Sequence, residues 1–275
     1  MASILTNVSA MSALQTLRSI NSNLENTQNN ISTGQRVSQA SDNAAYWSIA
    51  TTMRSDNGAL SAVEDAIGLG AAKVDTAYSG MESAIEVVKE IKKKLVTAQE
   101  GSVDSKKVQE EITQLQEQLK SIAESASFSG KNLIAGSGTE SVVSGFVRDS
   151  NGGVSVKKTE YVMSTGTDAN VLFGTNTSGA LVTTSGILGN SGTVGSGTAS
   201  VITLDVTNTS ANYLSDALTM VENALTSMTS AGAELGSISM RIDLQEDFIS
   251  KLSDSLESGI GRLVDADMNE ESTRL

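Results

Sequence analysis

The sequence predicts a mainly α-helical protein, in which N- and C-terminal arms form a long antiparallel helical coiled-coil rod around a small β-rich middle insert. Three observations predict this fold. Apolar residues recur at spacings of three and four along most of both ends, which is the period of a helix buried on one face. Proline, which breaks helices, is absent, and aromatic residues make up only 3%. Glycine, serine and threonine are frequent in the middle, where the helical period is lost.

The composition excludes several kinds of chemistry. The 275 residues contain no His and no Cys, so the usual Ser-His-Asp and Cys-His catalytic groups, zinc sites with nitrogen and sulfur ligands, and disulfides are ruled out. The net charge of −13 argues against binding nucleic-acid phosphates, which requires clustered Lys and Arg. No apolar run approaches the roughly 20 residues that span a bilayer. We therefore expect no enzyme, no cofactor or metal, no nucleic-acid partner and no membrane insertion.

Residues 1–35 form a helical stripe that is poor in charge. Arg18 and Glu25 are the only charged residues in it. Asn, Ser, Thr and Gln fill its polar faces, and these are indifferent helix formers. The segment is either an amphipathic helix packed on its own domain or one that folds when it meets partner helices. The lack of charge on its polar faces favours the second interpretation.

The stretch ISTGQRVSQASDNAAYWSIATTMRSD, at residues 31–56, joins this stripe to a much longer helix. The helical pattern ends at Gly34, and Ser41-Asp42-Asn43 starts an Ala-rich helix. That helix is expected over residues 43–99, a length of about 80 Å at 1.5 Å per residue. Gly68 and Gly70 are expected to loosen or bend it. Helices of this length are typical of coiled coils and fibres.

Two further helical segments complete the predicted rod. One follows a turn at residues 101–104, and its short connection predicts antiparallel packing on the preceding helix. The other begins at Tyr213 and continues to Leu263. The residues predicted to form the rod core are Val108, Ile112, Leu115, Leu119, Ile122, Leu218, Val221, Leu225, Leu235 and Ile242.

The middle of the chain has a different composition. No charged residue lies between Asp168 and Asp205. Short apolar stretches separated by glycine predict strands at residues 141–147, 154–162, 169–173 and 199–206. The region is therefore expected to be a small β-rich insert or an irregular, partly flexible one.

Four motifs, in order, resemble those of the bacterial flagellin family. Residues 31–45 (ISTGQRVSQASDNAA) resemble the family's N-terminal turn and helix start. Residues 128–131 (FSGK) resemble its Phe-Asn-Gly-x hairpin motif. Residues 235–242 resemble its Leu-Gly-x-x-x-x-Arg segment, and residues 262–267 resemble its Ile-x-Asp-Ala-Asp. The ordered set, around an insert, is specific, and the apolar stripe of residues 1–35 is similar too.

The resemblance covers nearly everything outside about residues 140–205. Residues 42–56 and 265–275 are most similar to flagellins of soil alphaproteobacteria such as rhizobia. The resemblance implies a structural subunit that is exported unfolded by the flagellar type III apparatus and polymerises into the bacterial flagellar filament for swimming motility. It implies other flagellin copies, an export chaperone and the filament cap as partners, and a secreted, extracellular location in the flagellum.

The resemblance also implies a division of the chain and a set of interface residues. The segments are an N-terminal inner-core helix and spoke (1–42), the N-terminal arm of the rod with a hairpin (43–139), a variable β-rich surface domain (140–208), the C-terminal arm (209–264) and the start of a C-terminal inner-core segment (265–275). The residues expected to contact neighbouring subunits are Ile4, Val8, Met11, Leu14, Leu17, Ile20, Leu24, Ile31, Gly34, Arg36, Asp42, Ala44 and Ala45.

Two alternatives remain at this point. A hook–filament junction protein of the same superfamily shares the terminal motifs, but its middle and C-terminal regions usually match the flagellin pattern less well than residues 235–275 do. A non-flagellar coiled-coil interaction module would explain the heptads but not the ordered motifs.

Two departures from the family pattern give further expectations. Family members continue past the Glu-Ser-Thr-Arg-Leu region into an apolar C-terminal helix, whereas this sequence stops at Leu275. If the protein really ends at Leu275, it lacks the inner-layer partner of the N-terminal stripe, and we then expect it to self-assemble poorly. The segment that aligns with the family's Toll-like-receptor patch has different residues at the Arg and Glu positions, which predicts weak recognition. Its residues are Glu90, Ile91, Lys92, Lys93, Lys94 and Leu95.

Overall fold

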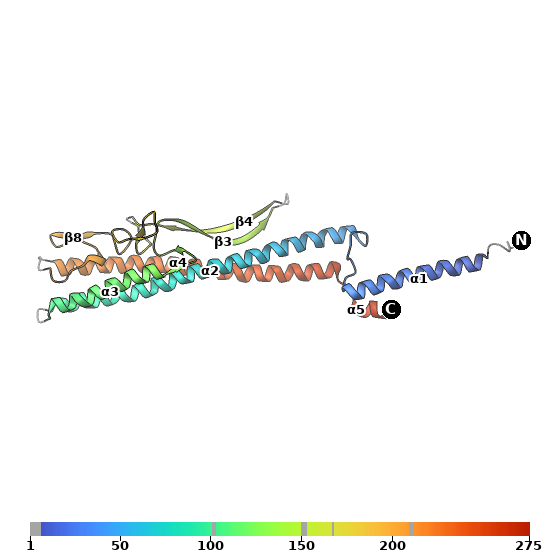
Figure 1. Cartoon of the computed structure of the whole chain (residues 1–275), viewed down its shortest axis with the longest axis horizontal. Helices are drawn as coiled ribbons and strands as arrows, with labels where there is room; N and C mark the ends of the chain where they lie inside the picture. Colours follow the sequence, from blue (N-terminus) through green and yellow to red (C-terminus); the bar gives the residue numbers. More distant parts are fainter. Residues whose placement is uncertain (1–6, 101–102, 150–152, 167, 209–211) are drawn as a thin grey trace. The chain divides into compact units, whose positions relative to one another are not determined.

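The computed structural model describes residues 7–100, 103–149, 153–166, 168–208 and 212–275. Five α-helices dominate these residues: α1 (Val8–Thr33), α2 (Ala44–Ala98), α3 (Ser105–Ser125), α4 (Tyr213–Val264) and α5 (Met268–Arg274) (Figure 1). The chain divides into a terminal unit, Met1–Ala62 with Ile249–Leu275, and a middle unit, Val63–Phe248. Helices α2 and α4 contribute residues to both units. The predicted mainly α class, with small antiparallel strand pairs in the middle, is confirmed.

The middle unit pairs its helices antiparallel. Lys92 Nζ on α2 lies 2.6 Å from Glu222 Oε2 on α4, whereas Ser239 Oγ on α4 donates to Asp75 Oδ1 on α2 at 2.9 Å. Partner numbers therefore rise along α4 as they fall along α2, which is the pattern of antiparallel neighbours. The two predicted helical arms do pair with each other.

A heptad repeat explains why α2 is so long. Within the middle unit, one series of its buried large residues is spaced by seven: Ile67, Val74, Met81, Val88 and Leu95. Small residues occupy the second heptad position, at Gly70, Ala77 and Ala84. A helix with this repeat keeps one seam facing its partners over many turns, and burial of that seam holds it in place.

Gly70 and Gly80 are required by close packing rather than by flexibility. A Cβ on Gly70 would clash with Val142 Cγ1, and a Cβ on Gly80 would lie 2.7 Å from the Ala126 Cβ. Helix α2 continues through Gly68 and Gly70 without interruption, so the expected loosening is not seen. Glycine at position 70 instead lets a strand of the insert approach the helix.

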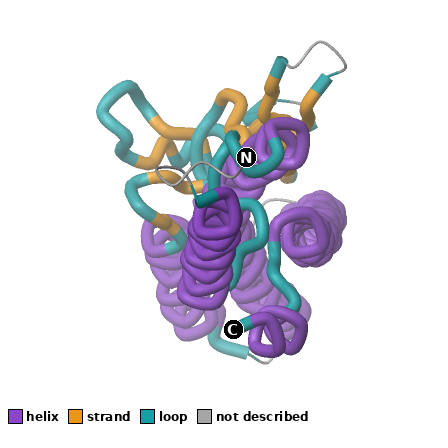
Figure 2. The backbone as a smooth tube through the Cα atoms, turned by 90° about the vertical axis from the view of Figure 1, so that its right-hand side faces the viewer, coloured by secondary structure: helices purple, strands orange, loops and turns teal. Residues whose placement is uncertain are grey.

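The insert contains four separate two-stranded antiparallel sheets among its described residues. The longest pairs β3 (Gly138–Arg148) with β4 (Val154–Met163), with a bulge between Val143 and Gly145. The other pairs join β1 (Ser127–Phe128) to β2 (Lys131–Asn132), β5 (Gly174–Thr175) to β6 (Leu181–Val182), and β7 (Gly192–Val194) to β8 (Gly197–Ala199). Figures 1 and 2 show these strands on one side of the helices of the middle unit.

Two of the four predicted strands are wrong. Residues 169–173 form bends and a single bridge from Phe173 to Ala135, and residues 199–206 contain a 3₁₀ turn, Val201–Thr203. Both segments are apolar because they fill the core of the insert, where Leu172, Phe173 and Leu204 are almost fully buried. Burial of a loop produces the same short apolar run as a strand does, so the pattern alone does not separate them.

Candidate assembly surface

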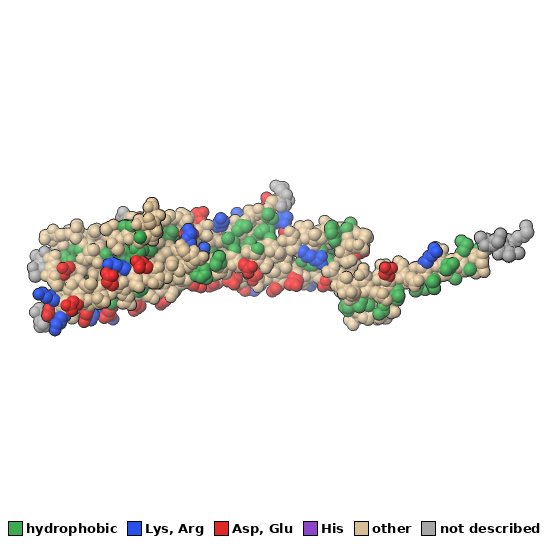
Figure 3. Space-filling model, viewed as in Figure 1, with side chains coloured by type: hydrophobic (Ala, Val, Ile, Leu, Met, Phe, Trp, Pro, Cys, Tyr) green, Lys and Arg blue, Asp and Glu red, His purple; other side chains and the backbone are tan. Residues whose placement is uncertain are grey.

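The apolar stripe of α1 is exposed along most of its length. The exposed fraction is 77% at Val8 and 40% at Leu24, and the residues between them at Met11, Leu14, Leu17 and Ile20 fall within this range. Ile4 lies outside the described residues, and Ile31 is half-buried. Figure 3 shows hydrophobic side chains along the outer surface of α1. Full burial of one such side chain would stabilise by about 1.5–3 kcal/mol, so the free stripe is a strong candidate for a contact surface.

Short helix α5 covers one face of the C-terminal half of α1. Thr27 is the one buried residue of α1, and Asn30 Nδ2 donates to Glu271 Oε1 at 3.2 Å. Asp267 caps α5, because its Oδ1 accepts a hydrogen bond from the backbone N–H of Asn269 at 2.9 Å. This junction orders the base of α1, whereas the N-terminal turns of the helix are exposed within the described part of the chain.

A hydrogen-bonded turn connects α1 to α2. Gly34 ends α1 in the left-handed conformation at φ 69°, which glycine adopts without strain. The backbone N–H groups of Arg36 and Val37 donate to Val264 O at 2.7 and 3.2 Å, and Arg36 Nη2 donates to Leu263 O at 3.2 Å. The C-terminal end of α4 therefore fixes the direction in which α1 leaves the terminal unit.

Asp42 closes the second half of this turn. Its Oδ2 accepts hydrogen bonds from the backbone N–H groups of Ser38 and Gln39, both at 3.0 Å, and from Ser38 Oγ at 3.2 Å. The bond from the Gln39 N–H is the main cause that lowers the pKa of Asp42 below its ordinary value of 3.8. Helix α2 is capped by the next residue, since Asn43 Oδ1 accepts from the Tyr46 N–H at 3.1 Å. Ala44 and Ala45 are exposed in its first turn.

The small core of the terminal unit lies beneath this turn. Val37, Ala50, Ile260 and Val264 form a buried cluster, and Met53 and Leu263 pack against it. The cluster joins the turn to the ends of both long helices. We infer that it holds the origin of α1 rigidly while the helix itself extends from it.

The predicted rod-core residues lie in the middle unit. Those that the structure buries are Val108, Ile112, Leu119, Val221, Leu235 and Ile242, and those that it half-buries are Leu115, Ile122, Leu218 and Leu225. These residues hold the unit together and are not surface sites.

Two glutamines on α3 were missed by the sequence analysis. Gln116 is buried, and its Nε2 donates to Val201 O at 3.0 Å and to Leu204 O at 3.2 Å. Gln109 accepts from the Val206 N–H at 2.8 Å through Oε1. The two glutamines are seven residues apart and so share one heptad position, which is the signal that could have identified them. They attach the insert to the helices.

The segment that aligns with the family's Toll-like-receptor patch, residues 90–95, is divided between core and surface. Ile91 and Leu95 are fully buried. Lys92, Lys93 and Lys94 form ion pairs with Glu222, Glu90 and Glu111, with distances between 2.6 and 2.9 Å. The hydrogen bond from Lys93 lowers the pKa of Glu90. The surface of this patch is thus made of paired charges.

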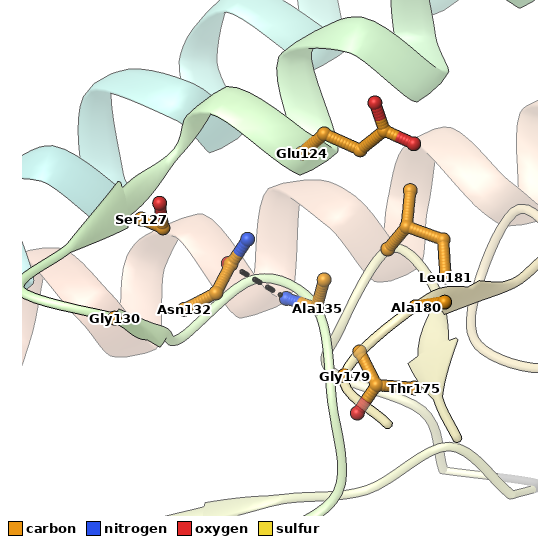
Figure 4. A pocket seen from close by; sticks show the side chains of 9 residues that line it. All are labelled: Glu124, Ser127, Gly130, Asn132, Ala135, Thr175, Gly179, Ala180 and Leu181. Carbon is orange, nitrogen blue, oxygen red and sulfur yellow. Dashed lines mark hydrogen bonds between the residues drawn. The ribbon is translucent and has the colours of Figure 1, made fainter. Parts of the chain in front are cut away.

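A pocket of about 400 Å³ lies where the β1–β2 hairpin meets the β5–β6 loop (Figure 4). The Asn132 amide at its edge is held by hydrogen bonds, because Oδ1 accepts from the N–H groups of Ile134 and Ala135 at 3.0 Å and Nδ2 donates to Ala123 O. Glu124 is its one ionisable lining residue. The pocket is bordered by a hydrogen-bonded turn, and its lining holds no pair of ionisable side chains that could act as acid and base.

No group of three or more acidic, His or Cys side chains in the described residues is placed to hold a metal ion. Among the described helices, none is both long enough and apolar enough to cross a membrane.

Comparison with known proteins identifies the family. The model of the bacterial flagellin N-terminal helical region matches residues 4–139, and that of the bacterial flagellin C-terminal helical region matches residues 218–275. The chain belongs to the bacterial flagellin family. Between the two matched regions, residues 140–217 of this flagellin carry most of the insert. The family and its structural role in the flagellar filament are as predicted.

Curated relatives match this flagellin over its whole length. Flagellin B of Rhizobium meliloti is 51% identical over 100% of this chain and 93% of that protein. Flagellin A of Rhizobium meliloti (strain 1021) is 50% identical with the same coverage. A flagellin of Brucella melitensis biotype 1 is 46% identical over 100% of this chain and 89% of that protein. The predicted similarity to rhizobial flagellins is confirmed.

The similarity to solved structures is lower. A putative flagellar hook-associated protein from Vibrio parahaemolyticus aligns with a TM-score of 0.48 and 15% identity, over 82% of this chain and all of that chain. Similarity at this level does not distinguish a filament subunit from a hook-associated protein.

Proposed function

We propose that this flagellin polymerises with further copies of itself through the apolar stripe of α1. The observation that carries the proposal is the exposure of that stripe, from Val8 to Leu24, on a helix with only two charged residues. A solvated helix normally carries charges on its polar faces. Helix α5 covers one face of the C-terminal half of α1, and the remaining stripe is exposed apolar surface that can bind other copies.

The geometry of the stripe favours more than one neighbour. From Val8 to Ile20 the apolar residues are spaced by three, at Met11, Leu14 and Leu17. At about 100° per residue, each step of three falls about 60° short of a full turn. The stripe therefore winds around α1 by roughly 240° between Val8 and Ile20. A helix that is apolar on several sides is typical of a helix buried among several others.

Polymerisation of this kind is heterologous. A helix that presents apolar residues on several sides contacts different surfaces on different neighbours, and such contacts continue into an open helical assembly. Export through the flagellar type III apparatus, an export chaperone, the filament cap and the extracellular location belong to this proposal on the strength of family membership. So do the predicted interface residues Gly34, Arg36 and Asp42, which set the direction of α1.

The proposal is tested by replacing one leucine on α1. Protein isolated from the producing cells would be depolymerised and seeded with sheared filaments, and the critical concentration would be measured by sedimentation. Leu17→Gln should raise the critical concentration about tenfold or more, because it removes about 1.5–3 kcal/mol of burial. Leu69→Gln, at a leucine that is 51% exposed on α2, is the matched control and should change it less than about threefold. Equal effects of the two variants would contradict the role of α1.

The copy number of this chain in purified flagella distinguishes a filament subunit from a hook–filament junction protein. A filament subunit should be the most abundant protein of flagella purified from the producing cells. Quantitative mass spectrometry that finds this chain at the level of a junction protein, far below the main filament protein, would favour the alternative.

A further inference from the structure

The outer face of the β3–β4 hairpin is apolar. Successive residues of a strand point to opposite faces. Val142 and Thr159 are paired and buried on the face of the hairpin that meets the helices. On the opposite face, Val154, Val156 and Val162 are 58%, 49% and 57% exposed. The exposed face of an antiparallel sheet is normally polar, so these valines are the observation to be explained.

Two charged residues lie on the same outer face, between the valines. Along β4 the order of the outward residues is Val156, Lys158, Glu160 and Val162. Neither Lys158 nor Glu160 makes a hydrogen bond or an ion pair within the described ranges of the chain. Phe146 of β3 is the cross-strand partner of Val156 and is half-buried, so it widens the apolar surface. The outer face is therefore an apolar strip with one free cation and one free acid.

Helix α4 of the same chain lies against the other face of the hairpin. Arg241 Nη2 on α4 donates to Thr159 Oγ1 at 3.3 Å. A Cβ on Gly145 would lie 3.4 Å from Gln245 Nε2, which is also on α4. The outer face is directed away from these contacts and is open to another molecule.

A groove between α2 and α4 has a lining that suits this face. The groove encloses about 440 Å³ and lies within the middle unit. Tyr78 and Ile85 of α2 and Leu225 and Ala233 of α4 line it with apolar surface. Tyr78 is 42% exposed, so much of its ring is open to contact. A single water takes about 30 Å³ of liquid, so the groove has room for several valine side chains.

Charged residues follow the α2 side of this groove. Glu86 Oε1 lies 2.7 Å from Lys89 Nζ, so these two side chains neutralise each other. Glu82 lies four residues after Tyr78, is exposed, and has no hydrogen-bond or ion-pair partner among the residues that the structure describes. The groove thus places one free acid beside an exposed aromatic ring.

We propose that the outer face of the β3–β4 hairpin of one copy docks in the α2–α4 groove of a second copy, where Lys158 binds Glu82. This contact lies outside α1 and goes beyond the polymerisation through α1 proposed above. Each copy carries both surfaces, so the contact is heterologous and repeats from copy to copy. At a net charge of −13 copies repel one another, and a cation placed at a free acid offsets that repulsion locally.

The charges also set the direction of docking. Two residues of a strand and four residues of a helix both span about 6–7 Å. When Val156 lies over Tyr78, Lys158 therefore lies one turn further along α2, beside the free acid. In the reverse direction Glu160 would take the place of Lys158 beside Glu82, and the two carboxylates would repel.

Cross-linking tests the contact directly, because the chain has no cysteine of its own. Val156→Cys and Ala233→Cys would be made in separate chains, mixed in equal amounts, added to seeds and treated with a short bis-maleimide. We expect a cross-linked dimer in the filaments that is absent from the unpolymerised mixture. Mass spectrometry should identify the link as joining position 156 of one variant to position 233 of the other.

Val147→Cys is the matched control for the cross-link. Val147 is 44% exposed, but it is paired with Ser155 and lies on the inner face of the hairpin. Val147→Cys mixed with Ala233→Cys should therefore give no dimer linked at these two positions. A yield equal to that of the Val156→Cys mixture would overturn the proposed docking.

Charge reversal gives an independent test. Lys158→Glu and Glu82→Lys should each raise the critical concentration about tenfold, because each places like charges together. An equal mixture of the two variants should polymerise within about threefold of the unaltered protein, because each position 158 then meets an opposite charge at position 82 of the other variant. Rescue by mixing requires contact between copies.

Lys157→Glu is the control for charge reversal. It changes the net charge as Lys158→Glu does, but Lys157 is paired with Gly145 on the inner face. It should raise the critical concentration by less than about threefold. Circular dichroism would establish that all the variants keep the helix content of the unaltered protein.

The outcomes separate this inference from the proposed function. If the unaltered protein polymerises, the link between positions 156 and 233 is absent and the folded charge-reversal variants behave as the unaltered protein does, the contact is overturned and the proposed function stands. If Leu17→Gln has no effect while the cross-link and the rescue are found, the role of α1 fails and this contact stands. If the unaltered protein does not add to seeds, polymerisation fails and this contact fails with it.

Discussion

Helices α1 and α3 carry similar apolar periodicity but lie in opposite environments. The stripe of α3 is buried in the middle unit at Val108, Ile112 and Leu119, whereas the stripe of α1 is exposed from Val8 to Leu24. The faces away from the stripe distinguish them. Those of α3 carry Glu110, Glu111, Glu117 and Lys120, while α1 has Arg18 and Glu25 in 26 residues. Periodicity thus indicates an apolar face, and the charge on the other faces indicates whether those faces stay in water.

The largest effect is expected when one leucine of each helix is truncated and the two losses of stability are compared. Leu119→Ala on α3 removes a fully buried side chain and should lower the free energy of unfolding of the middle unit by about 2–5 kcal/mol. Leu17→Ala on α1 should change monomer stability by less than about 0.5 kcal/mol. Urea unfolding followed by circular dichroism measures both. A loss above about 1 kcal/mol for Leu17→Ala would mean that α1 is packed in the monomer.

A smaller effect is expected at two glycines of α2. Gly70→Ala places a Cβ against Val142 and should destabilise the middle unit by about 1–3 kcal/mol through overpacking. Gly68→Ala has no neighbour within 4 Å and should stabilise by about 0.5–1 kcal/mol through helix propensity. Chemical denaturation of the two variants gives the comparison, and Val142→Ala should restore much of the stability of Gly70→Ala. Equal effects at both glycines would show that the insert does not approach α2 closely.

The smallest effect concerns the turn at Asp42. Because the folded-state pKa of Asp42 is lowered, its stabilising contribution is present above its ordinary value of 3.8 and is lost as the pH falls through the lower folded value. In the Asp42→Asn variant, the backbone amide hydrogens of Ser38 and Gln39 should therefore exchange faster near pH 7 than they do in the unaltered protein. Hydrogen exchange corrected for the intrinsic pH dependence should show this difference shrinking below about pH 4. A difference that is constant with pH would exclude the carboxylate as its cause.

Much of the helical fold could be predicted, because a heptad repeat of apolar residues indicates which face of a helix is buried. The bounds of α2 and α3 follow from caps and period, and strands β3 and β4 follow from short apolar stretches separated by glycine. The loops at residues 169–173 could not be separated from strands, because both are short apolar runs in a Gly-rich context. The prediction that Gly70 loosens the helix was wrong. Glycine is required there because Val142 packs closely against it, and Val142 is distant in the sequence.

The candidate site was predicted in part. The α1 stripe and the turn at Gly34 were identifiable from spacing and charge. The burial of Glu271 was not, because a carboxylate in a polar C-terminal sequence gives no sign of burial until α5 is placed beside α1. The attachment of the insert by Gln109 and Gln116 was missed for a similar reason, since exposed glutamines are common on helices.

Hydrogen–deuterium exchange of α1 in the monomer and in the filament tests the central claim most directly. The claim predicts that amides over residues 8–24 exchange rapidly in the monomer and become at least about 100-fold slower in the filament, because only other copies bury the stripe. Amides over residues 105–125 of α3 should be protected in both states. Strong protection of residues 8–24 in the monomer, unchanged on polymerisation, would contradict the account.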